Sequence, residues 1–195
     1  MRLLKHVPNA ITCGNLLCGC LALLQIGQGE LVNASCLVGL AMVLDFFDGF
    51  AARLLKVSSP IGKDLDSLAD MVTFGVVPGF MMFQLIALAV TGNAVTQFAN
   101  SPLALLQTAI APPKTPIESY VALIIPVLSA VRLAKFNNDT RQSDSFIGLP
   151  TPANAMFLCS IPLIAEAYPS LMANPGGVSN VWVLMVLCVV MSFLL

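Results

Sequence analysis

Residues 43–75 read VLDFFDGFAARLLKVSSPIGKDLDSLADMVTFG, and they contain five of the ten acidic residues of the chain. Asp45 and Asp48 are spaced i, i+3, and Asp66 and Asp70 are spaced i, i+4, so each pair shares one face of a helix. The Ser-Ser-Pro-Ile-Gly stretch between the pairs predicts a loop that joins the two helices as an antiparallel hairpin. In such a hairpin the four carboxylates converge at one end of the helix pair.

Four carboxylates in one place favour a bound cation, because like charges at short range would otherwise keep one another protonated. Arg53 supplies only one positive charge nearby. Ligation by oxygen alone, with no His or Cys interleaved, suits Mg²⁺ or Mn²⁺ rather than zinc. Two such ions fit four aspartates, and paired ions suit displacement at phosphorus. The alternative is a group of interfacial carboxylates satisfied by water and by the nearby Lys56, Lys63 and Arg53.

The composition of the whole chain indicates a membrane protein. Of its 195 residues, 57% are hydrophobic and only 10% are charged, with a mean hydropathy of +0.88. Soluble domains carry about 25% charged residues, and a net charge of −1 argues against nucleic-acid binding, because there is no excess of basic residues. Because a spanning helix needs about 20 apolar residues, the sequence predicts an all-α polytopic protein with about six spans, near 8–27, 31–54, 67–91, 117–135, 152–170 and 179–195.

The basic residues predict how these spans are oriented. Eight of the nine lie at the N-terminus, between spans two and three, or between spans four and five, and only Lys114 lies on the other side. Because cytoplasmic loops carry an excess of Lys and Arg, we assign the N-terminus to the cytoplasm. Residues 93–116 predict a long connection whose apolar piece, Leu103–Ile110, lies along the membrane interface. The last span reaches Leu195 without a polar cap, so we expect further sequence beyond it.

Two other patterns flank the carboxylates. Gly49, Ala51 and Ala52 leave one helix face nearly bare, which favours close approach of a nucleotide, with tight helix packing as the alternative. Asn9, Thr12 and Asn15 form one polar stripe at the start of the first span. That stripe indicates either contact with the nucleotide or hydrogen bonds between helices.

These residues resemble a known signature. Asp45-x-x-Asp48-Gly49-x-x-Ala52-Arg53, then eight residues, then Gly62-x-x-x-Asp66-x-x-x-Asp70, is similar at every fixed position to the signature of the CDP-alcohol phosphatidyltransferase family. Further similarity to the members that use serine lies in Pro8–Thr12, in Asp66–Gly75, in Arg132–Asn137 and in Phe146–Ala153. The resemblance covers residues 7 to about 170. Lys135 departs from it, since relatives commonly carry arginine there.

The resemblance implies a reaction and a set of site residues. The hydroxyl of L-serine would attack the lipid-linked phosphorus of CDP-diacylglycerol, and CMP would leave. Two divalent ions would be held by Asp45, Asp48, Asp66 and Asp70, and Asp70 would be the general base. The residues implied to bind CDP are Asp48, Gly49, Ala52, Arg53, Gly62, Asn9, Thr12 and Asn15. Those implied to bind serine are Arg132, Thr73, Lys135 and Thr151, although Arg132 can also be a boundary anchor and Thr151 a helix cap.

The resemblance further implies one catalytic domain over residues 1–195, with its helix hairpin at about 31–91, in a homodimer. It places the active site at the cytoplasmic face of the cell membrane. Two alternatives stay open. A glycerol phosphate or inositol phosphate acceptor would call for an extra basic cluster. A divalent-cation transporter would need carboxylates near the bilayer midplane, whereas these lie at one interface.

Overall fold

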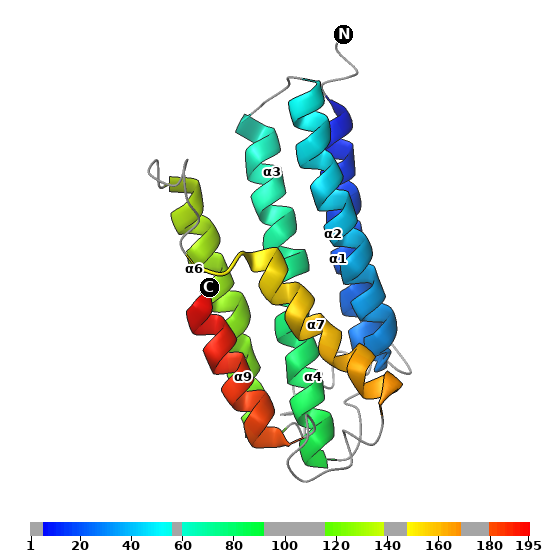
Figure 1. Ribbon diagram of the computed structural model, residues 1–195, viewed down its shortest axis with the longest axis vertical. Coiled ribbons are helices and arrows are strands. Elements are labelled where there is room, and N and C mark those ends of the chain that lie inside the picture. Colours follow the sequence, from blue (N-terminus) through cyan, green and yellow to red (C-terminus); the bar gives the residue numbers. More distant parts are fainter. Residues whose placement is uncertain (1–5, 56–59, 92–115, 139–147, 169–179) are drawn as a thin grey trace, which may run out of the picture.

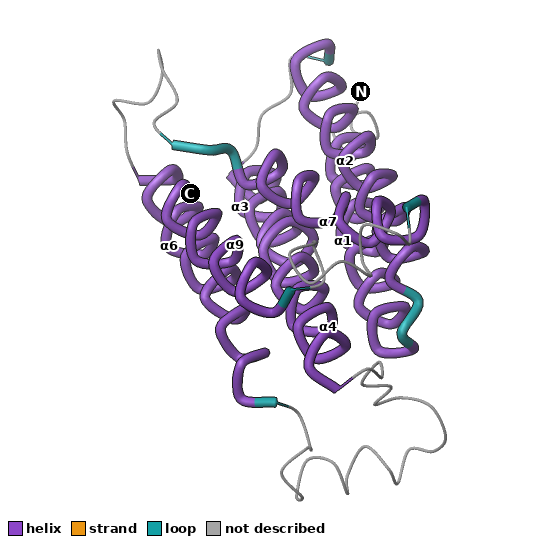
Figure 2. The backbone as a smooth tube through the Cα atoms, turned by 60° about the horizontal axis from the view of Figure 1, so that its bottom comes forward, coloured by secondary structure: helices purple, strands orange, loops and turns teal. Residues whose placement is uncertain are grey.

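The computed structural model describes residues 6–55, 60–91, 116–138, 148–168 and 180–195. Every regular element in these ranges is helical, and the helices form one bundle with a long vertical axis (Figure 1). A second view shows the same helices side by side (Figure 2). The predicted all-α fold class of a polytopic membrane protein is therefore confirmed.

Nine helical elements make up the described chain. They are α1 (Val7–Gln28), α2 (Leu31–Leu54), α3 (Pro60–Asp70), the π-helix η2 (Met71–Val76), α4 (Val77–Thr91), the 3₁₀-helix η3 (Ile117–Leu123), α6 (Ile124–Asn138), α7 (Thr151–Ala167) and α9 (Val181–Leu194).

Four helices are long and apolar enough to cross a membrane, namely Val7–Gln28, Leu31–Leu54, Ile61–Thr91 and Ile117–Asn138. The last two combine α3, η2 and α4, and η3 with α6. Because α7 has 17 residues and α9 has 14, the count of six spans stays a prediction. The predicted connection 93–116, with Leu103–Ile110, lies outside the described residues except for Pro116.

The first two spans form a helical hairpin around Gly29. This residue has φ 85°, a left-handed conformation that glycine adopts without a steric penalty, and its N–H donates to the carbonyls of Gln25 and Ile26. Small buried residues, Ala22 on α1 and Ala34 on α2, belong to the core. The result is an antiparallel helix pair that leaves the end of α2 beside the start of α1 (Figure 1).

The third span begins earlier than the sequence predicted. We expected a loop over Ser58–Gly62 and a span from about residue 67, but α3 already starts at Pro60. Proline suits the first turn of a helix, because the N–H it lacks has no partner there and its φ is already helical. Asp66 and Asp70 therefore lie inside a formed helix and not at its start.

The third span also supplies the centre of the bundle. Phe74, Met81, Met82 and Ile86 are all fully buried. Large apolar side chains on the other helices face outward instead, among them Leu17, Trp182 and Phe193. A bundle that is apolar on its outside is typical of a protein surrounded by lipid.

The lipid-facing surface of α2 runs close to its carboxylates. Phe46, Phe47 and Phe50 are exposed, and they occupy the same turns of α2 as Asp45 and Asp48.

At the opposite side of the bundle, the N–H of Leu149 donates to the carbonyl of Leu194 at 2.7 Å, which holds the start of α7 against the end of α9.

Candidate metal and active site

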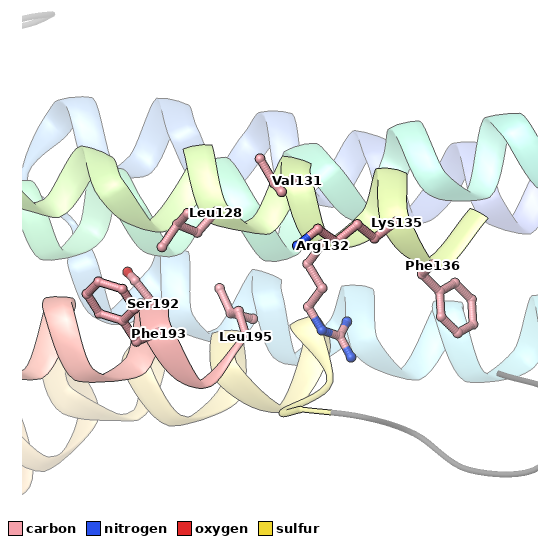
Figure 3. Close-up of a pocket in the computed structure, with 8 residues that line it drawn as sticks. All are labelled: Leu128, Val131, Arg132, Lys135, Phe136, Ser192, Phe193 and Leu195. Carbon is pink, nitrogen blue, oxygen red and sulfur yellow. The ribbon is translucent and has the colours of Figure 1, made fainter. Parts of the chain in front are cut away.

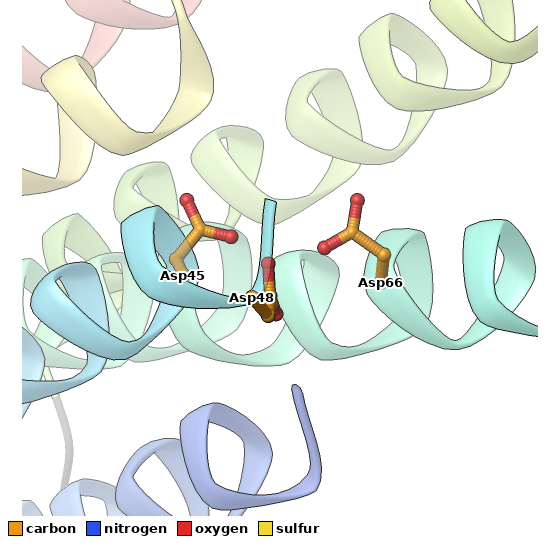
Figure 4. Close-up of side chains that lie close together, drawn as sticks. All are labelled: Asp45, Asp48 and Asp66. Carbon is orange, nitrogen blue, oxygen red and sulfur yellow. The ribbon is translucent and has the colours of Figure 1, made fainter. Parts of the chain in front are cut away.

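Three aspartates from two helices come together between α2 and α3. One carboxylate oxygen each from Asp45, Asp48 and Asp66 lies within 4.8 Å of the other two, and we call these three residues the aspartate cluster. Asp48 is only 6% exposed, and the other two are half-buried. Figure 4 shows Asp45 and Asp48 on α2 and Asp66 on α3.

Asp70 lies at the edge of this cluster, one turn after Asp66 on α3. Its side chain is in hydrogen-bonding contact with that of Asp45, and the amide nitrogen of Asn15 donates to its Oδ1 at 3.4 Å. Two carboxyl groups in contact need a shared proton or a cation between them. The structure thus brings all four predicted ligand residues to one place, three within the cluster and Asp70 through Asp45.

Helix α1 supplies neutral hydrogen-bond donors to these carboxylates. The Thr12 hydroxyl donates to Asp48 Oδ2 at 2.7 Å and also lies 3.1 Å from the carbonyl of Pro8. Because a hydroxyl has a single proton, the shorter contact to Asp48 is the stronger one. Asn15 is fully buried, and its Oδ1 has no partner. Asn9, earlier on the same helix, is half-buried. Two members of the polar stripe, Thr12 and Asn15, therefore hold Asp48 and Asp70 in position.

The donor set fits a hard divalent cation. Mg²⁺ binds oxygen at about 2.0–2.1 Å, so ligand oxygens on opposite sides of the ion are about 4.2 Å apart. The oxygens of the aspartate cluster all lie within 4.8 Å of one another, a limit slightly above that value. Among the described residues, these carboxylates have hydrogen bonds or electrostatic interactions with neutral donors and with one another, and none is recorded with a Lys or Arg. Of the lysines in the predicted alternative, Lys63 donates to the Asn137 carbonyl, and Lys56 lies outside the described residues.

The small-residue face of α2 is open. A side chain built on Gly49 would meet none of the described atoms within 4 Å, so this glycine is not there for tight packing against a neighbouring helix. Ala52 is half-buried and Arg53 is exposed, one turn beyond Asp48. Gly62 lies half-buried in the first turn of α3. Contact of this face with a nucleotide stays a prediction.

On the α6 side of the third span, the long side chain of Arg132 reaches from α6 to the start of α7. The Arg132 Nη1 donates to the Thr151 hydroxyl at 2.8 Å, and Thr151 is fully buried. Arg132 also lines a cavity of about 340 Å³ between α6 and α9, together with Lys135 and Ser192. In Figure 3 its guanidinium extends toward the start of α7. Lys135 itself is exposed.

Thr73 is placed away from this side. It is fully buried, and its hydroxyl donates to the backbone carbonyl of Asn15 at 3.3 Å. A side chain on Gly19 would lie 2.4 Å from the Thr73 Oγ1, so α1 and η2 approach each other closely here. Of the four residues predicted to bind serine, the structure joins Arg132 and Thr151, leaves Lys135 exposed, and uses the Thr73 hydroxyl to connect two helices.

Two polar residues next to the aspartates had no assigned role in the sequence. The amide of Asn137 at the end of α6 donates to the Ser67 hydroxyl at 2.8 Å, and Ser67 directly follows Asp66. The Lys63 Nζ donates to the Asn137 carbonyl at 3.3 Å. These contacts hold α6 against α3 at the level of the aspartates. Ser67 and Asn137 lie in the motifs that carry the family resemblance, and that resemblance was the only signal in the sequence that they have a role.

Comparison with known proteins identifies a family model and several relatives. Residues 5–194 match the model of the family described as CDP-alcohol phosphatidyltransferase. The chain is 32% identical over 170 residues to a Bacillus subtilis protein named CDP-diacylglycerol–serine O-phosphatidyltransferase, which covers 87% of this chain and 81% of the relative. Proteins of that name from Helicobacter pylori (32% over 169 residues) and Methanocaldococcus jannaschii (29% over 168 residues) each cover 86% of this chain. The aligned region spans 61% and 66% of those two relatives.

Proposed function

The chain belongs to the CDP-alcohol phosphatidyltransferase family, and from that premise we propose that it transfers the phosphatidyl group of CDP-diacylglycerol to the hydroxyl of L-serine. The products are phosphatidylserine and CMP. The serine oxygen forms a new bond to the lipid-linked phosphorus, the bond from that phosphorus to the CMP oxygen breaks, and the hydroxyl proton leaves to a base on the protein. The relatives' names support serine as the acceptor.

The observation that carries this proposal is the convergence of the aspartate cluster and Asp70 from two helices. Asp45, Asp48, Asp66 and Asp70 would hold two divalent ions, Mg²⁺ or Mn²⁺. When bound, these ions would neutralise the charge of the pyrophosphate and of the leaving CMP. Proton transfer and the positioning of both substrates are then the tasks of the protein's own side chains.

Asp70 is the proposed general base. It lies at the edge of the cluster and contacts both Asp45 and Asn15, so it faces the reacting region from α3 while its position is fixed from α1. A carboxylate within hydrogen-bonding reach of the serine hydroxyl accepts its proton as the oxygen attacks phosphorus. The neutral donors Thr12 and Asn15 orient Asp48 and Asp70 without forming ion pairs with them.

The nucleotide is proposed to lie along the open face of α2. Gly49 and Ala52 leave room for it, and Arg53 stabilises negative charge on its phosphates. Gly62 and Asn9 complete the proposed CDP-binding set with Asp48, Thr12 and Asn15. The exposed phenylalanines beside these residues let the acyl chains stay in lipid.

Serine is proposed to bind on the side of the third span where Arg132 meets Thr151. The guanidinium of Arg132 offers a partner for the serine carboxylate. Lys135 and Thr73 belong to the predicted serine set, although the hydroxyl of Thr73 already donates to the Asn15 carbonyl. A phosphorylated acceptor is the other candidate within the family, and the experiment below separates the two.

We further propose that residues 1–195 form one domain, with the catalytic helix pair at about 31–91. The distribution of basic residues supports an active site at the cytoplasmic face of the cell membrane. The homodimer implied by the family also stays a prediction.

The test is CMP release from CDP-diacylglycerol by the purified protein with Mg²⁺ or Mn²⁺. Serine, glycerol 3-phosphate and inositol phosphate are supplied separately. We expect release with serine only, and a loss of about 100-fold or more in Asp70→Asn, in line with the contribution of a general base. Asp64→Asn is the matched control, because Asp64 is an exposed aspartate of the same helix outside the cluster. Release with a phosphorylated alcohol alone would refute serine as the acceptor, and no release with any acceptor would refute the transferase activity.

A further inference from the structure

A group of buried polar atoms without hydrogen-bond partners surrounds the contact between Arg132 and Thr151. It consists of the Ser129 hydroxyl, the Arg132 Nε and both amide atoms of Asn154. Ser129 and Asn154 are fully buried. Leaving a buried polar group without a partner costs about 1–3 kcal/mol, so such groups call for a ligand or an ordered water.

Helix geometry places Ser129 and Asn154 at the same depth. Ser129 precedes Arg132 by three residues on α6, and Asn154 follows Thr151 by three residues on α7. The two helices run in opposite directions along the bundle (Figure 1). Each residue therefore lies a little less than one turn, about 4.5 Å along its helix, from the contact between Arg132 and Thr151, in the direction away from the C-terminal end of α6.

Both residues face the centre of the bundle. A side chain on Gly75 of η2 would lie 3.1 Å from the Ser129 Cβ, so Ser129 packs against the π-helix that begins directly after Asp70. Asn154 belongs to a fully buried face of α7 that also contains Thr151, Ala155 and Leu158. Helix α7 contacts α2, which carries Asp45 and Asp48, and η2, which begins directly after Asp70.

The available hydrogen-bonding groups indicate which part of a ligand fits there. Serine carries a hydroxyl, a carboxylate and an ammonium group. The proposed function directs the hydroxyl to Asp70 and the carboxylate to Arg132. The N–H donors of the ammonium group then still need hydrogen-bond acceptors. An asparagine side chain has an acceptor oxygen, and a serine hydroxyl also accepts.

We propose that Ser129 and Asn154 are specificity-determining residues that accept hydrogen bonds from the ammonium group of an amino-acid acceptor. This inference rests on the proposed function. It assigns the preference for an amino acid over a plain hydroxy acid to two uncharged side chains below Arg132.

The test compares two acceptors that differ by the ammonium group. The KM for serine and the inhibition constant of 3-hydroxypropionate against serine are measured for the wild type, Ser129→Ala and Asn154→Leu. We expect the KM for serine to rise by about 10- to 100-fold in each variant, as for a hydrogen bond to a charged group. The inhibition constant of 3-hydroxypropionate and the KM for CDP-diacylglycerol should stay within about twofold of the wild type, since neither ligand uses the lost contact.

Ser119→Ala is the matched control. Ser119 is also a fully buried serine with an unpartnered hydroxyl, and it lies in the same spanning helix ten residues before Ser129. We expect it to leave all three constants unchanged. An unchanged KM for serine in both variants would overturn the inference, and so would a parallel rise of the KM and the inhibition constant, because a structural role affects both ligands alike. If the wild type does not use serine at all, the proposed function fails and this inference fails with it.

Discussion

The Thr12 hydroxyl shows how a neutral residue controls a charged one at this site. It reaches Asp48 from another helix at 2.7 Å, and both groups are buried. A hydrogen bond to a charged group contributes about 1.5–3 kcal/mol. We therefore expect this hydroxyl to hold the carboxylate in the conformation proposed to bind a cation.

Replacing Thr12 by valine tests this role, because valine keeps the shape and removes the hydroxyl. We expect the Mn²⁺ concentration that gives half-maximal CMP release to rise by about 10- to 100-fold, in proportion to the lost hydrogen bond. Thr12→Ser keeps the hydroxyl and should behave like the wild type. Equal Mn²⁺ dependence in valine and serine variants would show that the hydroxyl has no such role.

At the scale of the helices, the approach of α1 to η2 depends on Gly19. A side chain there would meet the Thr73 Oγ1 at 2.4 Å and the Thr73 Cα at 3.2 Å, and the Cα belongs to the backbone, which cannot rotate away. We expect Gly19→Ala to destabilise the protein by about 1–3 kcal/mol, the usual effect of overpacking. The measurement is the melting temperature in detergent.

The control for this substitution is Gly39→Ala on α2. A side chain at Gly39 meets none of the described atoms within 4 Å, so the same change there should be neutral or stabilising by up to about 1 kcal/mol. If both variants melted at the wild-type temperature, the contact between α1 and η2 would be looser than the structure indicates.

The sequence predicted the helices better than their boundaries. The spacing of the four aspartates was enough to place them on two facing helices, because helical periodicity fixes which residues share a face. It placed the start of the third span several residues too late, since the Ser, Pro and Gly residues there are also typical of loops. The π-helical turn after Asp70 had no signal, because its register depends on packing between helices.

The sequence predicted fewer of the residues that are proposed to bind the serine acceptor. The resemblance pointed to Arg132 and Thr151, which the structure joins. Ser129 and Asn154 had no such signal, because a small polar residue in an apolar helix is equally typical of ordinary packing. The folded chain distinguishes them by two features together, their unpartnered polar atoms and their place about one turn from the contact between Arg132 and Thr151.

At the scale of the whole molecule, a cation at the aspartate cluster would cross-link α2 and α3. A ligand that binds only the folded state stabilises it by about 2.7 kcal/mol at a concentration 100 times its Kd. We therefore expect Mg²⁺ or Mn²⁺ to raise the melting temperature of the purified protein and EDTA to lower it. Asp66→Asn should abolish this difference, whereas Asp64→Asn should preserve it. A melting temperature that does not respond to either ion would contradict the site.

The exposed Phe46, Phe47 and Phe50 beside Asp45 and Asp48 have a kinetic consequence. A lipid that reaches the carboxylates past these side chains arrives by diffusion within the plane of the bilayer, so its effective concentration is two-dimensional. The initial rate should then follow the mole fraction of CDP-diacylglycerol in proteoliposomes. Diluting the vesicles with buffer at constant serine should leave the turnover per enzyme unchanged, while diluting the substrate with inert phospholipid should lower it. A turnover that fell with buffer dilution would show that the lipid reaches the carboxylates from water.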